Sequence, residues 1–241
     1  MTTHRKRSSG KPSVRHRLVR RLLLASAVFF LGLPMVLLLS LRWLPPPSSA
    51  LMIERRLSGH SPQITYEWVD LDQISPQAVV AVVAGEDQKF ALHHGFDKEA
   101  IETALEEHGD GGRLRGGSTI SQQLAKNLFL WPGRNYLRKG LEAVWTVGIE
   151  LVWPKRRIIE VYLNVVEFGE GTFGVGAASH RYFGKPAAQL TASEAALLAA
   201  VLPNPHRMRV SAPSPYLRQR QSWIQEQMVQ LGGPAYLDSL D

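Results

Sequence analysis

The chain has 241 residues, enough for one globular domain and a short extension, and it contains no cysteine. This excludes disulfide bonds, a thiolate nucleophile and a cysteine-ligated zinc site. The formal charge is +7, but nine of the 28 Lys and Arg residues lie in residues 1–42, which hold no Asp or Glu. The remaining 19 basic residues face 21 acidic ones, so the rest of the chain gives no support for nucleic acid as a partner.

An uncharged apolar run, Leu22–Leu41, follows the basic tail of residues 1–21. As a helix it would extend about 30 Å, the thickness of a bilayer core, so the sequence predicts a single transmembrane helix. The preceding positive charges predict a cytoplasmic N-terminus and a remainder outside the cytoplasm. A cleaved signal peptide is the alternative, although the run is longer than a typical signal-peptide core.

Residues 42–72 are predicted to be a linker, stiffened by Pro45–Pro47, and an extended or strand-like lead-in. The globular domain is predicted at residues 73–241. Its first helix starts at Ser75-Pro76 and ends near Glu86, and Asp97 can cap a second one over residues 98–108. A glycine-rich loop, residues 109–117, follows.

The rest of the domain has the pattern of successive helices. Ser118 or Thr119 can cap a helix that stops at Trp131-Pro132-Gly133. Thr191 and Glu194 form a capping-box pattern before an apolar helix that ends at Pro203. The other predicted segments are helices at residues 136–152 and 156–166, a loop at 168–176 and a last helix from Ser214-Pro215 to Gly232-Gly233. The predicted fold class is mainly α, with at most one small β element.

Two acidic residues, Glu86 and Asp87, follow the apolar run QAVVAVVAG. A carboxylate beside apolar side chains is partly desolvated, which raises its pKa and suits it to work as a general base near neutral pH. The alternative is a solvated or capping carboxylate at a helix end.

A polar cluster without acidic residues runs from Ser118 to Asn127 and includes Gln122, Gln123 and Lys126. Such a stretch can bind hydroxylated or phosphorylated ligands. The alternative is a helix with a polar exposed face. The cluster is not a Walker loop, because the chain has no GxxxxGK[ST] pattern.

Basic residues follow in two groups. Arg134, Arg138 and Lys139 form the first and residues 155–157 the second, and both could bind pyrophosphate or lipid headgroups. The alternative for the second group is solvated helix ends. Glu142 lies one turn after Arg138, so it could simply pair with it.

Two other patterns carry little weight. His93 and His94 are adjacent and lack a third ligand at helical spacing, so we expect no metal site. Ser8–Lys11 matches SxxK by chance, because it lies in the basic tail and no KTG follows in the chain.

Four ordered segments resemble the motifs of the family 51 peptidoglycan glycosyltransferases. EDQKFALHHG resembles E-D-x-x-F-x-x-H-x-G, and GGSTISQQLAKNLFL resembles G-G-S-T-[IL]-x-Q-Q-L-x-K-N. Arg138-Lys139-x-x-Glu142 and KRRIIEVYLN resemble the next two, and the match extends from about Pro76 to Asn204. The likeness is to members without a transpeptidase domain, since the stretch after Pro205 is short and the serine-transpeptidase motifs are missing. The departures are the second histidine before Gly95 and Trp131-Pro132-Gly133 in place of a polar insert.

The resemblance implies a lysozyme-like, two-lobed domain and lipid II as the substrate. It implies that Glu86 is the catalytic base and Glu142 the second catalytic glutamate. The substrate-binding positions that it implies are Asp87, Phe90, His94, Gly117, Ser118, Thr119, Gln122, Gln123, Lys126, Asn127, Arg134 and Arg138.

In the implied reaction, Glu86 deprotonates an acceptor hydroxyl, which attacks the donor sugar with inversion to form a β-1,4 glycan and release undecaprenyl pyrophosphate. No cofactor is required by this reading, with Mg²⁺ or Mn²⁺ as an optional helper at Glu142. The implied partners are the growing glycan, the inner membrane of a two-membrane bacterium, and other cell-wall synthases or division proteins. The alternatives are a lysozyme-like or lytic glycan-cleaving enzyme and an inactive glycan-binding scaffold.

Overall fold

The computed structural model describes residues 20–21, 32–59, 63–97, 99, 118–133 and 135–240. The chain divides into two units, Met1–Trp43 and Leu44–Asp241. The first unit contains helix α2 (Leu33–Leu41), with Pro34 in its first turn. Among the described residues, no helix is long and apolar enough to cross a membrane. Residues 22–31 of the predicted transmembrane helix lie outside the described residues.

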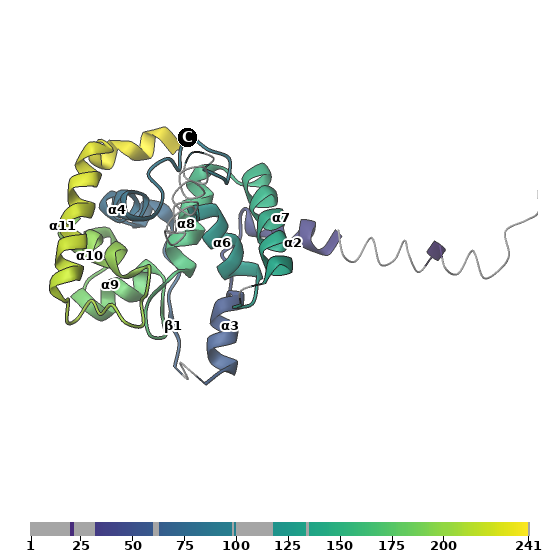
Figure 1. The fold of residues 1–241 in the computed structure, drawn as a ribbon, viewed down its shortest axis with the longest axis horizontal. Helices are drawn as coiled ribbons and strands as arrows, with labels where there is room; N and C mark the ends of the chain where they lie inside the picture. The colour runs from purple at the N-terminus through teal and green to yellow at the C-terminus, as the bar shows by residue number, and fades with distance from the viewer. Residues whose placement is uncertain are drawn as a thin grey trace, which may run out of the picture. The chain divides into compact units, whose positions relative to one another are not determined.

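The second unit is built mainly of helices (Figure 1), which confirms that the fold is mainly α. Its α-helices are α3 (Ala50–Leu57), α4 (Pro76–Glu86), α6 (Ile120–Phe129), α7 (Tyr136–Val152), α8 (Lys155–Val165), α9 (Val175–Phe183), α10 (Ala192–Val201) and α11 (Pro215–Gln230). The described residues also form the 3-10 helices η2 (Leu71–Gln73), η3 (Ala187–Gln189) and η4 (Gly233–Leu240). The predicted helix over residues 98–108 lies almost entirely outside the described residues.

Helix α4 is buried on all sides, and it packs against α10, α11 and η4. Every residue from Ala78 to Ala84 is buried, as expected of a helix without a polar face. Pro76 occupies its first turn, where a missing N–H costs nothing. The last residue of α4 is Glu86, so its carboxylate lies at the edge of this apolar core.

A second group consists of α6, α7 and α8, which lie side by side in Figure 1. Helix α6 starts with a capping box in which Thr119 and Gln122 satisfy each other's backbone N–H groups. Asn135 caps the N-terminus of helix α7, and its side chain accepts a hydrogen bond from Arg138 N. These caps fix where α6 and α7 begin, and with them the positions of the polar residues in their first turns.

The β structure is more extensive than the sequence predicts. Strands β1 (Thr65–Tyr66), β2 (Glu167–Gly169) and β3 (Thr172–Phe173) form a sheet of order β1-β3-β2, with β1 parallel and β2 antiparallel to β3. The loop predicted at residues 168–176 is wrong for most of its length, because the two strands and the start of α9 occupy six of its nine residues. Gly174 follows β3 with φ of 84°, and a Cβ there would lie 2.6 Å from Asn164 O, so this turn requires glycine.

Part of the predicted lead-in is also wrong, because Ala50–Leu57 is helical. Ser49 caps α3 by accepting a hydrogen bond from Met52 N, and Met52 is buried. Helix α3 has only eight residues and one buried residue, Met52, so it is shorter than the stretch over which helical periodicity can be recognised in a sequence.

Candidate active site

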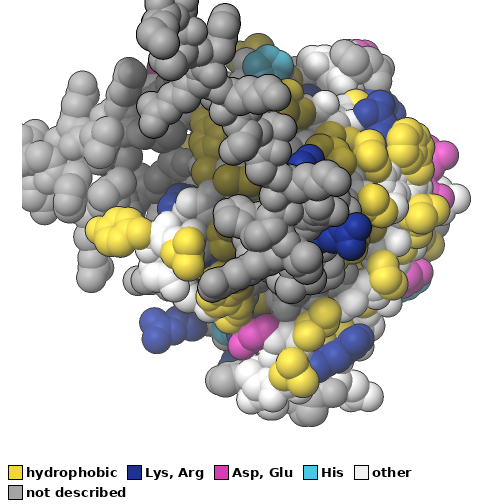
Figure 2. Space-filling view, turned by 90° about the vertical axis from the view of Figure 1, so that its right-hand side faces the viewer, with side chains coloured by type: hydrophobic (Ala, Val, Ile, Leu, Met, Phe, Trp, Pro, Cys, Tyr) yellow, Lys and Arg dark blue, Asp and Glu magenta, His cyan; other side chains and the backbone are white. Residues whose placement is uncertain are grey.

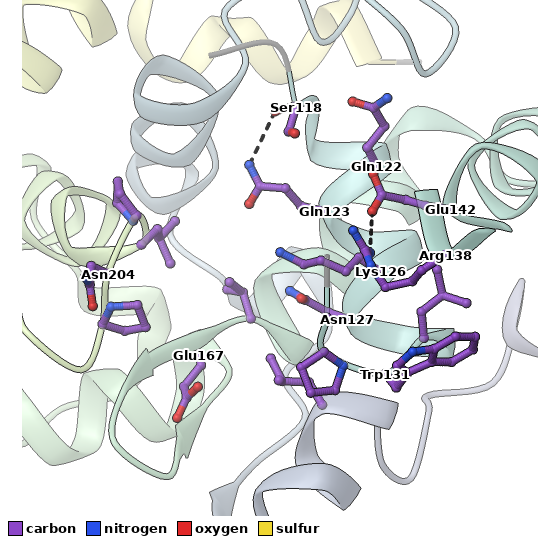
Figure 3. Close-up of a pocket in the computed structure, with 18 of the residues that line it drawn as sticks. Ser118, Gln122, Gln123, Lys126, Asn127, Trp131, Arg138, Glu142, Glu167 and Asn204 are labelled. Atoms are coloured by element: carbon purple, nitrogen blue, oxygen red, sulfur yellow. Dashed lines mark hydrogen bonds and ion pairs between the residues drawn. The ribbon is translucent and has the colours of Figure 1, made fainter. Parts of the chain in front are cut away.

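A cavity of about 850 Å³ lies beside α6 and the start of α7 (Figure 3). This volume is within the range of pockets that hold small ligands. One side carries Gln123, Lys126 and Asn127 from α6, and the opposite side carries Glu167 and the segment Leu202–His206. The segment Leu202–His206 directly follows α10. The cavity therefore lies between residues of α6 and residues about 75 positions later in the sequence.

Glu86 is held at the end of α4 with little exposure to solvent, since its side chain is only 10% exposed. Burial raises its pKa above the ordinary value of 4.5. The hydrogen bond from Gln123 and the positive charges of Arg220 and Lys126 oppose that rise, and the neighbouring Asp87 carboxylate adds to it. Glu86 is therefore prepared to accept a proton, as the sequence predicts for a carboxylate after this apolar run.

Gln123 connects Glu86 to the interior of the protein. Its Nε2 donates to Glu86 Oε2 at 2.9 Å, and its Oε1 accepts a hydrogen bond from the Tyr162 hydroxyl at 2.9 Å. Arg220 approaches Glu86 Oε1 at 3.4 Å and donates to Gly85 O at 3.1 Å. The sequence analysis did not identify Tyr162 or Arg220, because only the folded chain brings α8 and α11 to the end of α4.

Asp87 faces the protein and not the cavity. Its carboxylate accepts from Ile120 N at 2.9 Å and from His93 Nε2 at 2.9 Å. Gly95 N donates to His93 Nδ1, so the ring hydrogen is on Nε2 and points to Asp87. Thr119 Oγ1 also donates to Gly95 O at 2.7 Å. These bonds fasten the start of α6 to the end of α4, which sets the distance between Glu86 and Gln123.

A cationic wall, defined here as Lys126, Arg138 and Lys139, lines the cavity together with Glu142. Arg138 donates to Glu142 Oε2 at 2.8 Å, and Lys139 bonds to the other oxygen. The i,i+4 pairing that the sequence allows is therefore present. Arg138 Nε is buried and has no hydrogen-bond partner among the described residues. Partial burial lowers the pKa of Lys126, an effect that the nearby Glu142 carboxylate opposes. The side chain nevertheless reaches the cavity.

The other predicted binding residues occupy different places. Ser118 is exposed at the cavity, where Gln122 and Asn127 also line the wall. Thr119 is buried in the capping box. Gly117 and Arg134 lie outside the described residues.

Phe90 and His94 do not line this cavity. Phe90 is fully buried beneath the Lys155 ammonium, which lies 4.5 Å from its ring centre. His94 is exposed, and His93 is the histidine that the structure joins to Asp87. The motif E-D-x-x-F-x-x-H contains the signal for this, because its histidine falls on His93. Substrate contact by Phe90 and His94 remains a prediction.

In the second basic group, residues 155–157, Lys155 and Arg157 form ion pairs within the protein. Lys155 donates to Glu150 at 2.9 Å, and Arg157 pairs with Glu160 at 2.5 Å and stacks over Trp68. Neither side chain lines the cavity. At the opposite end of the cavity, Glu167 accepts from Arg55 and approaches His206, each at 3.2 Å. No sequence pattern pointed to this cluster, because its members come from three separate segments.

The residues present do not fit a divalent cation at Glu142, because Arg138 and Lys139 occupy both carboxylate oxygens. Within the described ranges, no group of three or more His, Asp or Glu side chains could hold a metal ion. The reaction proposed below therefore contains no step through a metal.

Comparisons with known proteins give one consistent result. A family model described as Transglycosylase matches residues 54–229. A biosynthetic peptidoglycan transglycosylase from Klebsiella oxytoca is 57% identical over 237 residues, covering 96% of both chains. Proteins of the same name from Xylella fastidiosa (strain M12) and Shigella boydii serotype 4 are 53% and 55% identical, over 91% and 92% of this chain and 92% of each relative. The relatives' names describe synthesis, and nothing in the comparisons favours the glycan-cleaving alternative.

Proposed function

Because this chain belongs to the transglycosylase family of peptidoglycan glycosyltransferases, we propose that it polymerises lipid II into β-1,4 glycan strands with Glu86 as the general base. Glu86 takes the proton from the acceptor's C4 hydroxyl, and that oxygen attacks the anomeric carbon of the donor. The configuration inverts, and undecaprenyl pyrophosphate leaves. The single observation that carries the proposal is the buried Glu86 carboxylate, with its raised pKa. Glu86 does not itself line the cavity, but it accepts a hydrogen bond from Gln123, which lines the cavity together with the cationic wall.

The environment of Glu86 suits this role. A general base works best when its pKa lies near the working pH, and burial moves the pKa of Glu86 in that direction. Gln123 donates a hydrogen bond to one carboxylate oxygen of Glu86, Oε2, at 2.9 Å. The other oxygen has the longer contact to Arg220, so it can turn to an acceptor hydroxyl without breaking a short ion pair.

The cationic wall suits the leaving group. A glycosidase needs a carboxylic acid to protonate its leaving oxygen, whereas a pyrophosphate leaves as a stable anion and needs positive charge. Lys126 and Arg138 supply that charge in the cavity, and Glu142 fixes the position of Arg138. The buried Nε of Arg138 has no hydrogen-bond partner within the described part of the chain, and a phosphate oxygen could accept its hydrogen bond.

A membrane location accounts for two further features. The first is the apolar run at residues 22–41, preceded by the basic tail. The second is an exposed stripe on α7, made by Leu137, Val144, Val147 and Leu151, whose spacing puts them on one helix face. Figure 2 shows exposed apolar side chains among Lys and Arg on the side of the molecule that includes α7. The proposed setting is the inner membrane with the catalytic unit in the periplasm, where lipid II and other cell-wall synthases work.

The test is incubation of the full-length chain with labelled lipid II, followed by separation of the products. We expect long glycan strands and undecaprenyl pyrophosphate, and a loss of at least about a hundredfold in Glu86→Gln. Glu170→Gln is the matched control, because Glu170 is exposed and lies outside the cavity. Near-normal polymerisation by Glu86→Gln would refute the role of Glu86. Release of soluble fragments from intact cell wall, with no use of lipid II, would refute the polymerase.

A further inference from the structure

Two consecutive hydrogen bonds connect the Glu86 carboxylate to Tyr162, a buried residue of α8. The Tyr162 hydroxyl donates to Gln123 Oε1, and Gln123 Nε2 donates to Glu86 Oε2, each at 2.9 Å. Tyr162 is completely buried, and Gln123 is partly exposed at the cavity. We propose that Tyr162 is a positioning residue, whose hydroxyl holds the Gln123 amide so that the amino group and not the carbonyl faces Glu86. This inference rests on the role of Glu86 proposed above.

The orientation matters because the two ends of an amide are nearly equal in shape and opposite in function. With the amino group toward Glu86, Gln123 stabilises the ionised carboxylate. With the carbonyl toward Glu86, two acceptor oxygens would face each other, and the contact would be favourable only if Glu86 carried a proton. The orientation of Gln123 and the ionisation of Glu86 are therefore coupled.

Tyr162 selects the first orientation because it acts as a constant donor. Burial raises the pKa of its phenol well above the ordinary value of 10, and the nearby charges of Glu86 and Asp87 raise it further. The hydroxyl thus keeps its hydrogen throughout the range in which Glu86 titrates. A buried hydroxyl needs an acceptor, and Gln123 Oε1 is that acceptor.

Other charged groups face Glu86 from the surrounding elements. Lys126 on α6 and Arg220 on α11 favour its ionised form, and Asp87 opposes it. From η4, Tyr236 lies near Asp87, and the buried residues from Ala195 to Val201 that α10 contributes to this core are all apolar. The hydrogen bond from Gln123 to Glu86 is shorter than the one from Arg220, 2.9 Å against 3.4 Å. Loss of its correct orientation should therefore have a measurable effect on Glu86.

The test is a titration of Glu86 that does not depend on any substrate. The full-length chain, with ¹³C-labelled glutamate side-chain carboxyls, is titrated by NMR, and Glu86→Gln identifies the Glu86 signal by its disappearance. In Tyr162→Phe the Glu86 midpoint should rise by about one pH unit, the scale of one hydrogen bond to a charged group. Gln123→Met should raise it at least as much, and adding Tyr162→Phe to Gln123→Met should have no further effect.

Tyr66→Phe is the matched control, because the Tyr66 hydroxyl also donates one hydrogen bond, to Pro46 O at 2.7 Å, away from the cavity. The Glu86 midpoint should not change in this variant. In polymerisation assays, the acid limb of the pH profile of Tyr162→Phe should move to higher pH, and activity at a pH below both midpoints should fall about tenfold.

An unchanged Glu86 midpoint in folded Tyr162→Phe, or a further rise in the double variant, would overturn the inference. If Tyr162→Phe does not fold, Gln123→Met decides, because it leaves the interior of α8 intact. An unchanged midpoint in Gln123→Met would mean that the amide has no hold on Glu86. Since the titration involves no lipid II, it can fail or succeed independently of the polymerase activity.

Discussion

The two glutamates implicated in the reaction have opposite neighbours. Glu86, at the end of α4, has a neutral amide at 2.9 Å and a guanidinium only at 3.4 Å. Glu142, in the first half of α7, is bound by Arg138 through one oxygen and by Lys139 through the other. On accepting a proton, Glu86 would weaken only its longer contact to Arg220, whereas Glu142 would have to release two cations. This difference supports the proposal that Glu86 transfers the proton and that Glu142 positions the positive charge.

Removal of the Glu142 carboxylate should have the largest effect on stability. In Glu142→Gln, the buried Arg138 guanidinium loses its ion pair, and breaking one side of a buried pair costs about 3 kcal/mol or more. Urea denaturation of the full-length chain measures this. Lys139→Met is the comparison, because Lys139 is half exposed and should contribute less than about 1 kcal/mol. Equal effects of the two substitutions would contradict the assignment of Arg138 as the principal partner.

Asp87→Asn should have an intermediate effect. The amide can still accept one hydrogen bond, but Ile120 N or His93 Nε2 then loses its charged acceptor, which costs about 2 kcal/mol. Since these bonds join α6 to α4, polymerisation should also fall, although Asp87 does not line the cavity. Urea denaturation and initial rates measure the two effects, and a variant with unchanged stability would refute the structural role.

Glu86→Gln should have the smallest effect on stability, and the effect should be of opposite sign. Because folding raises the pKa of Glu86, the folded state binds more protons than the unfolded state above pH 4.5. The stability contributed by Glu86 is complete below that pH and is lost as the pH rises through its raised pKa. The variant should therefore gain stability over the wild type at neutral pH and not at pH 4. Thermal melting at both values tests this, and a destabilised variant at neutral pH would contradict it.

The sequence predicts those parts of the fold whose local signals agree with their packing. The apolar run before Glu86, the capping pair Thr191 and Glu194 and the boundaries of α7 all appear as expected. Strand β1 lies in the lead-in that was predicted to be extended or strand-like. The short helix α3 and strands β2 and β3 were not predicted, because so few residues establish no periodicity.

In the candidate site, too, residues with a local sequence signal were predicted and residues without one were not. Residues adjacent in the sequence, from Ser118 to Asn127, were identified as one polar cluster, and four of them line the cavity together with Lys126. Arg220 contacts Glu86 over a sequence separation of 134 residues, and Tyr162 is connected to Glu86 through its hydrogen bond to Gln123. No local pattern contains such contacts, and so only the arrangement of α8 and α11 around α4 identifies them.

The central claim is that Glu86 accepts the proton in glycosyl transfer, and the pH dependence of kcat/KM for lipid II tests it most directly. The wild type should lose activity as the pH falls through a single midpoint above 4.5, the ordinary value for this side chain. In Glu86→Gln the residual rate should lack that limb. The same acid limb in Glu86→Gln, at a rate close to that of the wild type, would contradict the account.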